Sequence, residues 1–152
     1  MKGIGAESPQ TVEVQIGETI NALVDGWNRH DMAALSAQFT EDADHVNVIG
    51  MHARGRAEIK ARHEAVHRTI FRNSVLRLEK YTWRRLADGV VLAHIEWQMT
   101  GQEGVPGVLS GEVRHGVATA IFIDQEGRWL FRAFHNTDIV PVSIPGAKKQ
   151  EA

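Results

Sequence analysis

The chain has 152 residues, of which 43% are hydrophobic and 24% charged, and its formal net charge is −2 at pH 7. This composition is typical of one globular domain, and it offers no basic surface to nucleic acid or to an anionic membrane. There is no cysteine, which excludes disulfides, thiolate catalysis and thiolate metal ligands. The first ten residues hold no apolar stretch that would make a signal sequence, and no run is long enough to span a membrane, so we expect a cytoplasmic protein.

Helical periodicity dominates the first 73 residues. Over residues 11–29 the apolar side chains recur every three or four positions, which predicts one helix with a single buried face. Asp31 suits an N-cap, and the spacing over 32–39 predicts a short second helix. The segment DHVNVI (44–49) has strand character, and a third helix is predicted over about 56–72. The buried face of the first helix is expected to contain Val12, Ile16, Ile20, Leu23 and Trp27.

After residue 73 the sequence is rich in β-branched and aromatic residues, which is typical of strands. Four such segments are separated by Asp88-Gly89, by a glycine-rich loop at 101–111 and by Gln125-Glu126-Gly127. Long antiparallel strands after helices indicate an α+β domain with the helices packed on one face of the sheet. We expect a single domain over residues 11–140, with flexible ends at 1–10 and 141–152. The strand segments are SVLRLEKYTWRRLA, VVLAHIEWQMT, SGEVRHGVATAIFI and RWLFRAFHNTDIV.

Three blocks of the sequence resemble a known family: WNRHDMAALSAQFTEDADHVNVIG (27–50), GRAEIKARH (55–63) and GRWLFRAFHNTD (127–138). With the order of the elements, they resemble the SnoaL-like, or nuclear transport factor 2-like, superfamily, and more narrowly its SgcJ/EcaC subfamily. The resemblance covers about residues 12–140. It implies a cone-shaped α+β barrel, in which a strongly curved antiparallel or mixed sheet wraps around three N-terminal helices and leaves a mostly apolar cavity. It also implies a homodimer.

The resemblance indicates where a site lies and leaves its reaction open. Members of the superfamily include isomerases, cyclases, epoxide hydrolases, dehydratases and proteins without known chemistry. The subfamily often carries an oxidoreductase label. Nothing in this sequence supports that label, because there is no G-x-G-x-x-G run and no flavin or haem signature. No cofactor is therefore predicted.

The segment ARHEAVHRT (61–69) contains His63-Glu64-Ala65-Val66-His67, a match to the H-E-x-x-H zinc motif. Arg62 and Arg68 flank the motif, and their charges oppose a bound dication. A third zinc ligand commonly comes from a following helix, whereas strands follow here. A zinc hydrolase using His63 and His67 is therefore a distant alternative, and no metal site is predicted.

His63 lies on the apolar stripe of the third helix. At ~100° per residue, His63, Val66 and Ile70 fall within about 40° of Ile59, whereas Glu64 points away. In the resembled fold this helix borders the cavity. His63 is therefore expected either as a hydrogen-bonded core residue or as a pocket residue that transfers protons.

Asn47 is a candidate that follows from the resemblance. It stands where the steroid isomerases of the superfamily carry the carboxylate that moves the proton. An amide cannot act as a general base near neutral pH, and the only tyrosine, Tyr81, is far along in a strand and cannot supply their phenol donor. Steroid-type isomerisation is therefore not predicted. Asn47 is expected to orient a carbonyl or a water, or to make a strand-end hydrogen bond.

The last hairpin supplies two further candidates. Around a turn at Glu126-Gly127, strict alternation places Phe131 and His135 on one face, with Arg114 and small residues across from them. Small residues beside large ones leave space, and a histidine and an arginine at one end suit an anionic or carbonyl group. The sequence leaves open which face is concave. The other face is apolar as well and is expected to pack on helices or to form a dimer contact; it contains Val117, Ile121, Leu130 and Phe134.

These features favour a SnoaL-like protein that binds a small hydrophobic organic molecule in its cavity. As an enzyme of secondary metabolism, of the isomerase, cyclase or dehydratase type, it would transfer protons with His63 or His135. A non-catalytic ligand-binding protein and a dimeric interaction module are the alternatives, and the sequence leaves open whether the protein is an enzyme. The expected ligand contacts are Asn47, Trp27, Trp97, Arg114 and Phe131.

Overall fold

The computed structural model describes residues 7–104, 113–141 and 145 of the chain. Its three helices are α1 (Pro9–Asn28), α2 (Met32–Ser36) and α3 (Arg56–His67). Helix α1 begins at Pro9 because the Ser8 side chain accepts a hydrogen bond from the Thr11 N–H and proline fits the first helical position. The predicted inward face of α1 is confirmed, since its core residues are buried: Val12, Ile16, Ile20 and Trp27, with Leu23 packed against them.

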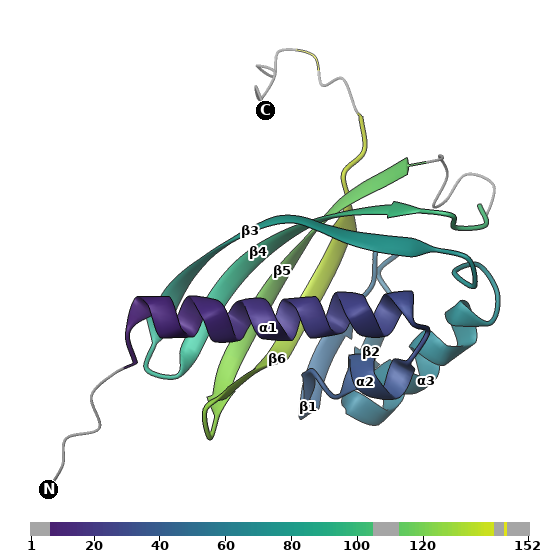
Figure 1. The fold of residues 1–152 in the computed structure, drawn as a ribbon. Helices are drawn as coiled ribbons and strands as arrows, with labels where there is room; N and C mark the ends of the chain where they lie inside the picture. Colours follow the sequence, from purple (N-terminus) through teal and green to yellow (C-terminus); the bar gives the residue numbers. More distant parts are fainter. Residues whose placement is uncertain (1–6, 105–112, 142–144, 146–152) are drawn as a thin grey trace, which may run out of the picture.

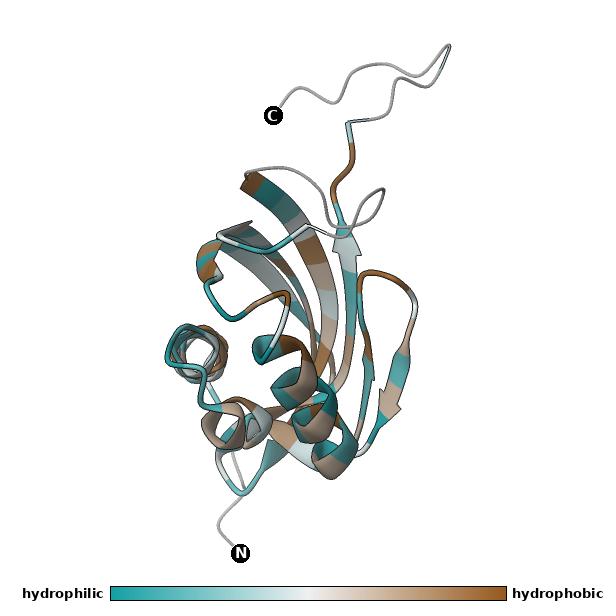
Figure 2. Cartoon of the chain, turned by 90° about the vertical axis from the view of Figure 1, so that its right-hand side faces the viewer, coloured by the Kyte–Doolittle hydropathy of each residue, from teal (hydrophilic) through white to brown (hydrophobic). Residues whose placement is uncertain are grey.

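Within the described residues, six strands form one curved mixed sheet on which the helices pack (Figure 1). Spatially the order is β2-β1-β6-β5-β4-β3; every neighbouring pair is antiparallel except β1 and β6, which are parallel. Figure 2 views the molecule from the side at which α3 lies, so that the axis of α1 points toward the viewer. In this view α1 lies beside α3, and both helices cover the same side of the sheet. The predicted α+β class is therefore confirmed. The strands are β1 (Phe39–Val46), β2 (His52–Arg54), β3 (Val75–Ala87), β4 (Val90–Thr100), β5 (Val113–Gln125) and β6 (Arg128–Asp138).

The boundaries of the first elements differ from those predicted. Phe39, expected at the end of the second helix, begins β1, and β1 ends at Val46 rather than at residue 49. The short strand β2 was not predicted, because three residues are too few for alternation to be recognised. Helix α3 ends at His67, five residues early, since the next turn is closed by the Thr69 N–H bonding to the Val66 carbonyl.

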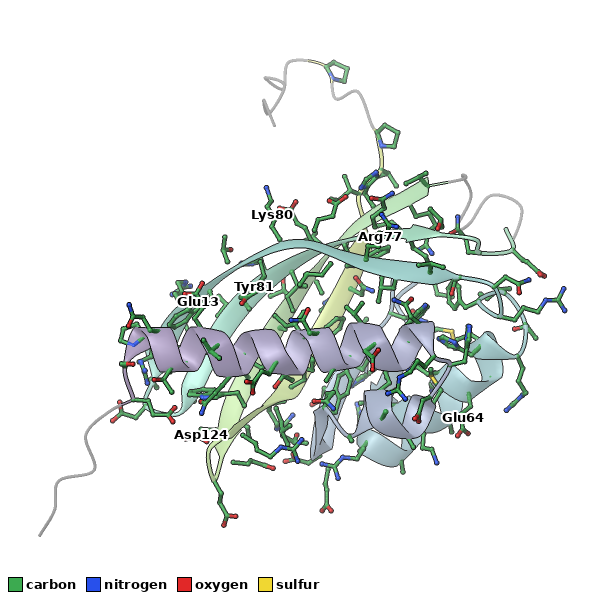
Figure 3. All side chains as sticks on the ribbon, in the orientation of Figure 1. Glu13, Glu64, Arg77, Lys80, Tyr81 and Asp124 are labelled. Carbon is green, nitrogen blue, oxygen red and sulfur yellow. The ribbon has the colours of Figure 1, made fainter. Side chains whose placement is uncertain are left out.

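The concave face of the sheet is the one that faces α1. Strand β4 alternates regularly between buried and more exposed residues, and its buried set from Val91 to Met99 faces the helices. On β3, Tyr81 faces α1 and donates a hydrogen bond to the Glu13 carbonyl, whereas Lys80 projects from the opposite side of the sheet (Figure 3). Of the helices described, none is both long and apolar enough to cross a bilayer.

A β-bulge in β6 changes which residues face the helices. Phe131 pairs with Phe122 of β5, but Ala133 pairs with the adjacent Ile121, so Arg132 is an extra residue in the strand. One extra residue moves every later side chain to the other face. The prediction that His135 shares a face with Phe131 is therefore wrong.

The bulge also corrects the position of Phe134. This residue was expected on the outer face with Val117, yet it is buried at 8% exposure on the helix side, while His135 is exposed. The flexible ends expected at 1–10 and 141–152 lie mostly outside the described residues. Residues 7–10 are described and lead into α1.

Candidate active site

A cavity of two adjoining compartments lies between the helices and the concave face of the sheet. The inner compartment has a volume of about 60 Å³ and the outer one about 280 Å³. α1 and the middle of the sheet form the walls of the inner one, whereas α3, the 47–51 turn and the ends of β4, β5 and β6 surround the outer one. Six of the described residues line both compartments: Trp27, His45, His63, Trp97, Met99 and Asn136.

Two tryptophans line both compartments: Trp27 and Trp97, which were expected to contact the ligand. The Trp27 indole N–H donates to the Ser74 hydroxyl at 2.9 Å. The Trp97 indole N–H donates to the Asn136 side-chain oxygen at 2.8 Å. Both side chains are less than a tenth exposed, and these hydrogen bonds fix the polar edge of each ring. Phe131, another expected ligand contact, lines the inner compartment only.

His63 projects from α3 into both compartments with a defined tautomer. Its Nδ1 lies 2.8 Å from the Ile59 carbonyl oxygen, which can only accept a hydrogen bond. Nδ1 therefore carries the proton, and in the neutral ring Nε2 holds a lone pair. No described residue makes a hydrogen bond to Nε2. Burial lowers the pKa of His63, so the ring is neutral at pH 7.

His45 is a second cavity histidine, and sequence reasoning missed it. Its ring is stacked on Phe134 at 5.4 Å and meets His63 edge-on at 5.0 Å between centroids. Burial, and then the nearby His63, lower the pKa of His45 to about 3. A signal was present, because Ala43 and His45 alternate on one side of a strand that ends beside Asn47.

A partly buried ion pair lies at the end of the cavity near Trp97. The Arg114 side chain is 5% exposed and lines the outer compartment, and its Nη2 donates to the Asp138 carboxylate at 2.5 Å. Its guanidinium lies 5.4 Å from the Trp97 ring centroid. Among the described residues, the buried Nε of Arg114 has no hydrogen-bond partner. Arg114 thus lines the cavity, but His135, which was expected at the same end, does not.

The two remaining predicted residues lie in different surroundings. Asn47 lines the outer compartment, but its side-chain oxygen accepts from the Ile49 and Met51 N–H groups and closes the turn after β1. That is the strand-end hydrogen bonding expected as its structural role. His135 lines neither compartment, because the bulge at Arg132 turns it to the outer face.

The H-E-x-x-H residues do not converge on one point. Nδ1 of His67 lies 2.8 Å from Nδ1 of His30, whereas Nδ1 of His63 bonds to a helix carbonyl. Burial, followed by the nearby His30 and His63, lowers the pKa of His67 to about 4. Glu64 points outward from α3 and pairs with Lys60 at 3.5 Å (Figure 3). Among the described residues, no three metal-ligating side chains are grouped to hold an ion.

The cavity therefore combines apolar walls with a few oriented polar groups. Its lining residues, all within the described part of the chain, include no aspartate or glutamate. A neutral imidazole with a free lone pair, His63, shares the space with a side-chain amide, Asn136, and a paired guanidinium, Arg114. This is the usual composition of a site for an organic molecule, in which polar groups orient an otherwise apolar ligand.

Comparisons with known proteins agree with this architecture. The sequence model of the SnoaL-like domain matches residues 20–132. No curated protein matches the chain in sequence. An uncharacterised protein with a cystatin-like fold from Caulobacter vibrioides is similar at 30% identity and a TM-score of 0.77, covering 85% of this chain and 90% of that one.

Two enzymes share the fold at lower identity. A putative scytalone dehydratase from Novosphingobium aromaticivorans is 14% identical with a TM-score of 0.73, over 88% of this chain and 89% of that one. A hexachlorocyclohexane dehydrochlorinase is 13% identical with a TM-score of 0.70, over 91% and 97%. At these identities the likeness establishes the fold alone.

Proposed function

The chain belongs to the SnoaL-like domain family, and from this premise we propose that it binds a small hydrophobic organic molecule in the cavity and transfers a proton on it. The reaction class is that of an isomerase, cyclase or dehydratase. One observation carries the proposal: the Nδ1–H of His63 is bound to the Ile59 carbonyl, which leaves the lone pair of Nε2 free beside an apolar cavity.

The size of the cavity supports a ligand of about two rings. An apolar cavity of ~150 Å³ is large enough to bind benzene. The outer compartment, at about 280 Å³, has nearly twice that volume, and the inner one adds about 60 Å³. Trp27 and Trp97 both line it, and their indole rings suit a flat ring system.

The chemistry follows from the position of one base. Nε2 of His63 takes a proton from a carbon of the ligand, and the electron pair of that C–H bond forms a new double bond. In an isomerisation the π electrons of the adjacent double bond shift by one position as the new double bond forms, and the imidazolium returns the proton to the carbon that receives them. In a dehydration a neighbouring C–O bond breaks, and the imidazolium gives its proton to the departing hydroxide, which leaves as water. The names of two fold neighbours, a dehydratase and a dehydrochlorinase, are those of eliminations of this kind.

Deuterium exchange into a probe tests this proposal without the natural substrate. The bicyclic ketone 2-tetralone has acidic C–H bonds next to its carbonyl, and proton NMR in D₂O follows their exchange. We expect the protein to accelerate exchange and His63→Gln to abolish the acceleration. His94→Gln, which changes an exposed histidine on the outer side of β4, is the matched control. Acceleration that survives His63→Gln would contradict the role of His63.

A non-catalytic ligand-binding protein is the second candidate. Two observations favour it: no carboxylate is among the described lining residues, and the pKa values of both cavity histidines are lowered, which weakens them as bases. Quenching of Trp27 and Trp97 fluorescence measures binding independently of turnover. Binding of 2-tetralone without any accelerated exchange would favour this candidate.

Two further assignments are part of the proposal. The blocks at 27–50, 55–63 and 127–138 favour the SgcJ/EcaC subfamily. The outer face of β5, with the partly exposed Val117 and Ile121, suits contact with a second copy of the chain. Light scattering on the wild type and on Ile121→Glu tests the dimer, because a charge in that contact is expected to give monomers.

A further inference from the structure

The side-chain amide of Asn136 has a defined orientation. Its Oδ1 accepts hydrogen bonds from the Trp97 indole N–H at 2.8 Å and from the Thr137 backbone N–H at 3.1 Å. Both partners are groups that can only donate, so the atom they share must be the oxygen. The other end of the amide is therefore the NH₂ group, a pure donor. Nδ2 donates to no protein atom among the described residues.

The orientation is held by a buried group of residues around Trp97. The indole lies over Gly116, where the absence of a side chain makes room for the ring. Arg114 lies 5.4 Å from the ring centroid and is fixed in turn by Asp138. Trp97 is 5% exposed, so its N–H has no water to replace the bond to Asn136. A donor held in this way is preorganised for a ligand.

We propose that Asn136 selects ligands that carry a carbonyl oxygen, which accepts a hydrogen bond from its side-chain NH₂ group. Asn136 lines both compartments, as does His63, so a ligand oxygen on Nδ2 leaves neighbouring carbon atoms in a space that His63 also lines. The amide would also stabilise negative charge on that oxygen when an adjacent C–H proton is removed. This inference rests on the proposed ligand site and adds its substrate class. Asn136 is a specificity-determining residue that the bulge at Arg132 turns inward.

Three probes with one carbon skeleton test the inference: 2-tetralone, its alcohol 2-tetralol, and the hydrocarbon tetralin. Binding to the wild type is measured by tryptophan fluorescence. We expect 2-tetralone to bind about five- to tenfold more tightly than tetralin, the effect of one buried hydrogen bond. The side-chain NH₂ signals of Asn136 in a ¹⁵N NMR spectrum should shift with 2-tetralone and stay in place with tetralin.

Asn136→Asp is the closest variant, because it keeps the side-chain shape and an oxygen for Trp97 while replacing the donor with an acceptor. In this variant the preference for ketone over tetralin should be lost, while the alcohol, which can donate, keeps its advantage. Asn136→Leu removes donor and acceptor together and should bring all three probes within about twofold. Equal binding of ketone and tetralin to the wild type, or a ketone preference that survives in Asn136→Leu, would overturn the inference.

The two proposals fail separately. If His63→Gln abolishes exchange while Asn136→Leu keeps the ketone preference, the proton transfer stands and the selection by Asn136 is wrong. If Asn136→Leu removes the preference but no exchange occurs in the wild type, Asn136 selects the ligand of a binding protein. Both readouts use the full chain.

Discussion

Gly116 lies directly against the indole of Trp97, and a Cβ atom at Gly116 would overlap the Cζ2 and Cε2 atoms of that ring. The ring cannot move freely, because its N–H is bound to Asn136 and its face is covered by Arg114. We therefore expect Gly116→Ala to destabilise the fold by about 1–3 kcal/mol, as overpacking of a core does. Urea unfolding measures the free energy difference.

A change on the opposite face of the same strand is the control for Gly116→Ala. Thr119 is exposed on β5, and Thr119→Ala should change the free energy of unfolding by no more than about 0.5 kcal/mol. If Gly116→Ala unfolds at the same urea concentration as Thr119→Ala, the packing of Trp97 on Gly116 is not a constraint on the fold.

Because of the bulge at Arg132, we expect substitutions at two adjacent residues to have very different effects on stability. Phe134 is buried among aromatic rings, 5.2 Å from Phe131 and 5.4 Å from His45. Phe134→Ala should therefore lower the free energy of unfolding by about 3–5 kcal/mol. His135 is exposed, and His135→Ala should cost about 0.5 kcal/mol or less. If the strand alternated strictly after Phe131, His135→Ala would be the more destabilising of the two substitutions. Thermal and urea unfolding of the two variants distinguish the registers.

The H-E-x-x-H segment predicts the outcome of a metal analysis. Glu64 points outward, and the described residues offer His63 and His67 no third ligand, so we expect purified protein to contain far less than one equivalent of zinc. Removal of metal with EDTA should leave the melting temperature unchanged. A stoichiometric metal that resists dialysis would contradict this.

The fold could be predicted from the sequence where the apolar residues keep one regular spacing along a whole helix or strand. The four-and-three spacing from Val12 to Trp27 describes the inward face of α1, and the alternation from Val91 to Met99 describes that of β4. Both patterns depend only on local geometry. The same holds for His63, whose position follows from Ile59 one turn earlier.

The remaining site residues depend on contacts between strands. Nothing in the sequence FRAFHN indicates that Arg132 is an extra residue, because the bulge arises from the pairing of β6 with β5 and β1. Strict alternation therefore favours His135 over Asn136. Local sequence likewise does not reveal that the Asn47 side chain closes a turn, since its partners are backbone groups.

The lowered pKa of His45 predicts how the stability of the protein changes with pH. Its pKa is about 3 in the folded protein and 6.5 when unperturbed, so between these values the unfolded chain binds the additional proton. Stability from this residue is fully present above pH 6.5 and is lost as the pH falls. At pH 4.5 the loss amounts to about 2–3 kcal/mol, the product of roughly two pKa units and 1.36 kcal/mol per unit.

The comparison that isolates this effect is wild type against His45→Phe, each unfolded with urea at pH 7 and pH 4.5. Phenylalanine keeps an aromatic ring against Phe134 and cannot be protonated. The carboxylates titrate in both proteins and cancel, so the variant should lose about 2–3 kcal/mol less than the wild type on acidification. Equal losses would mean that His45 takes up its proton without cost, and the ring would then be in contact with water rather than buried beside His63.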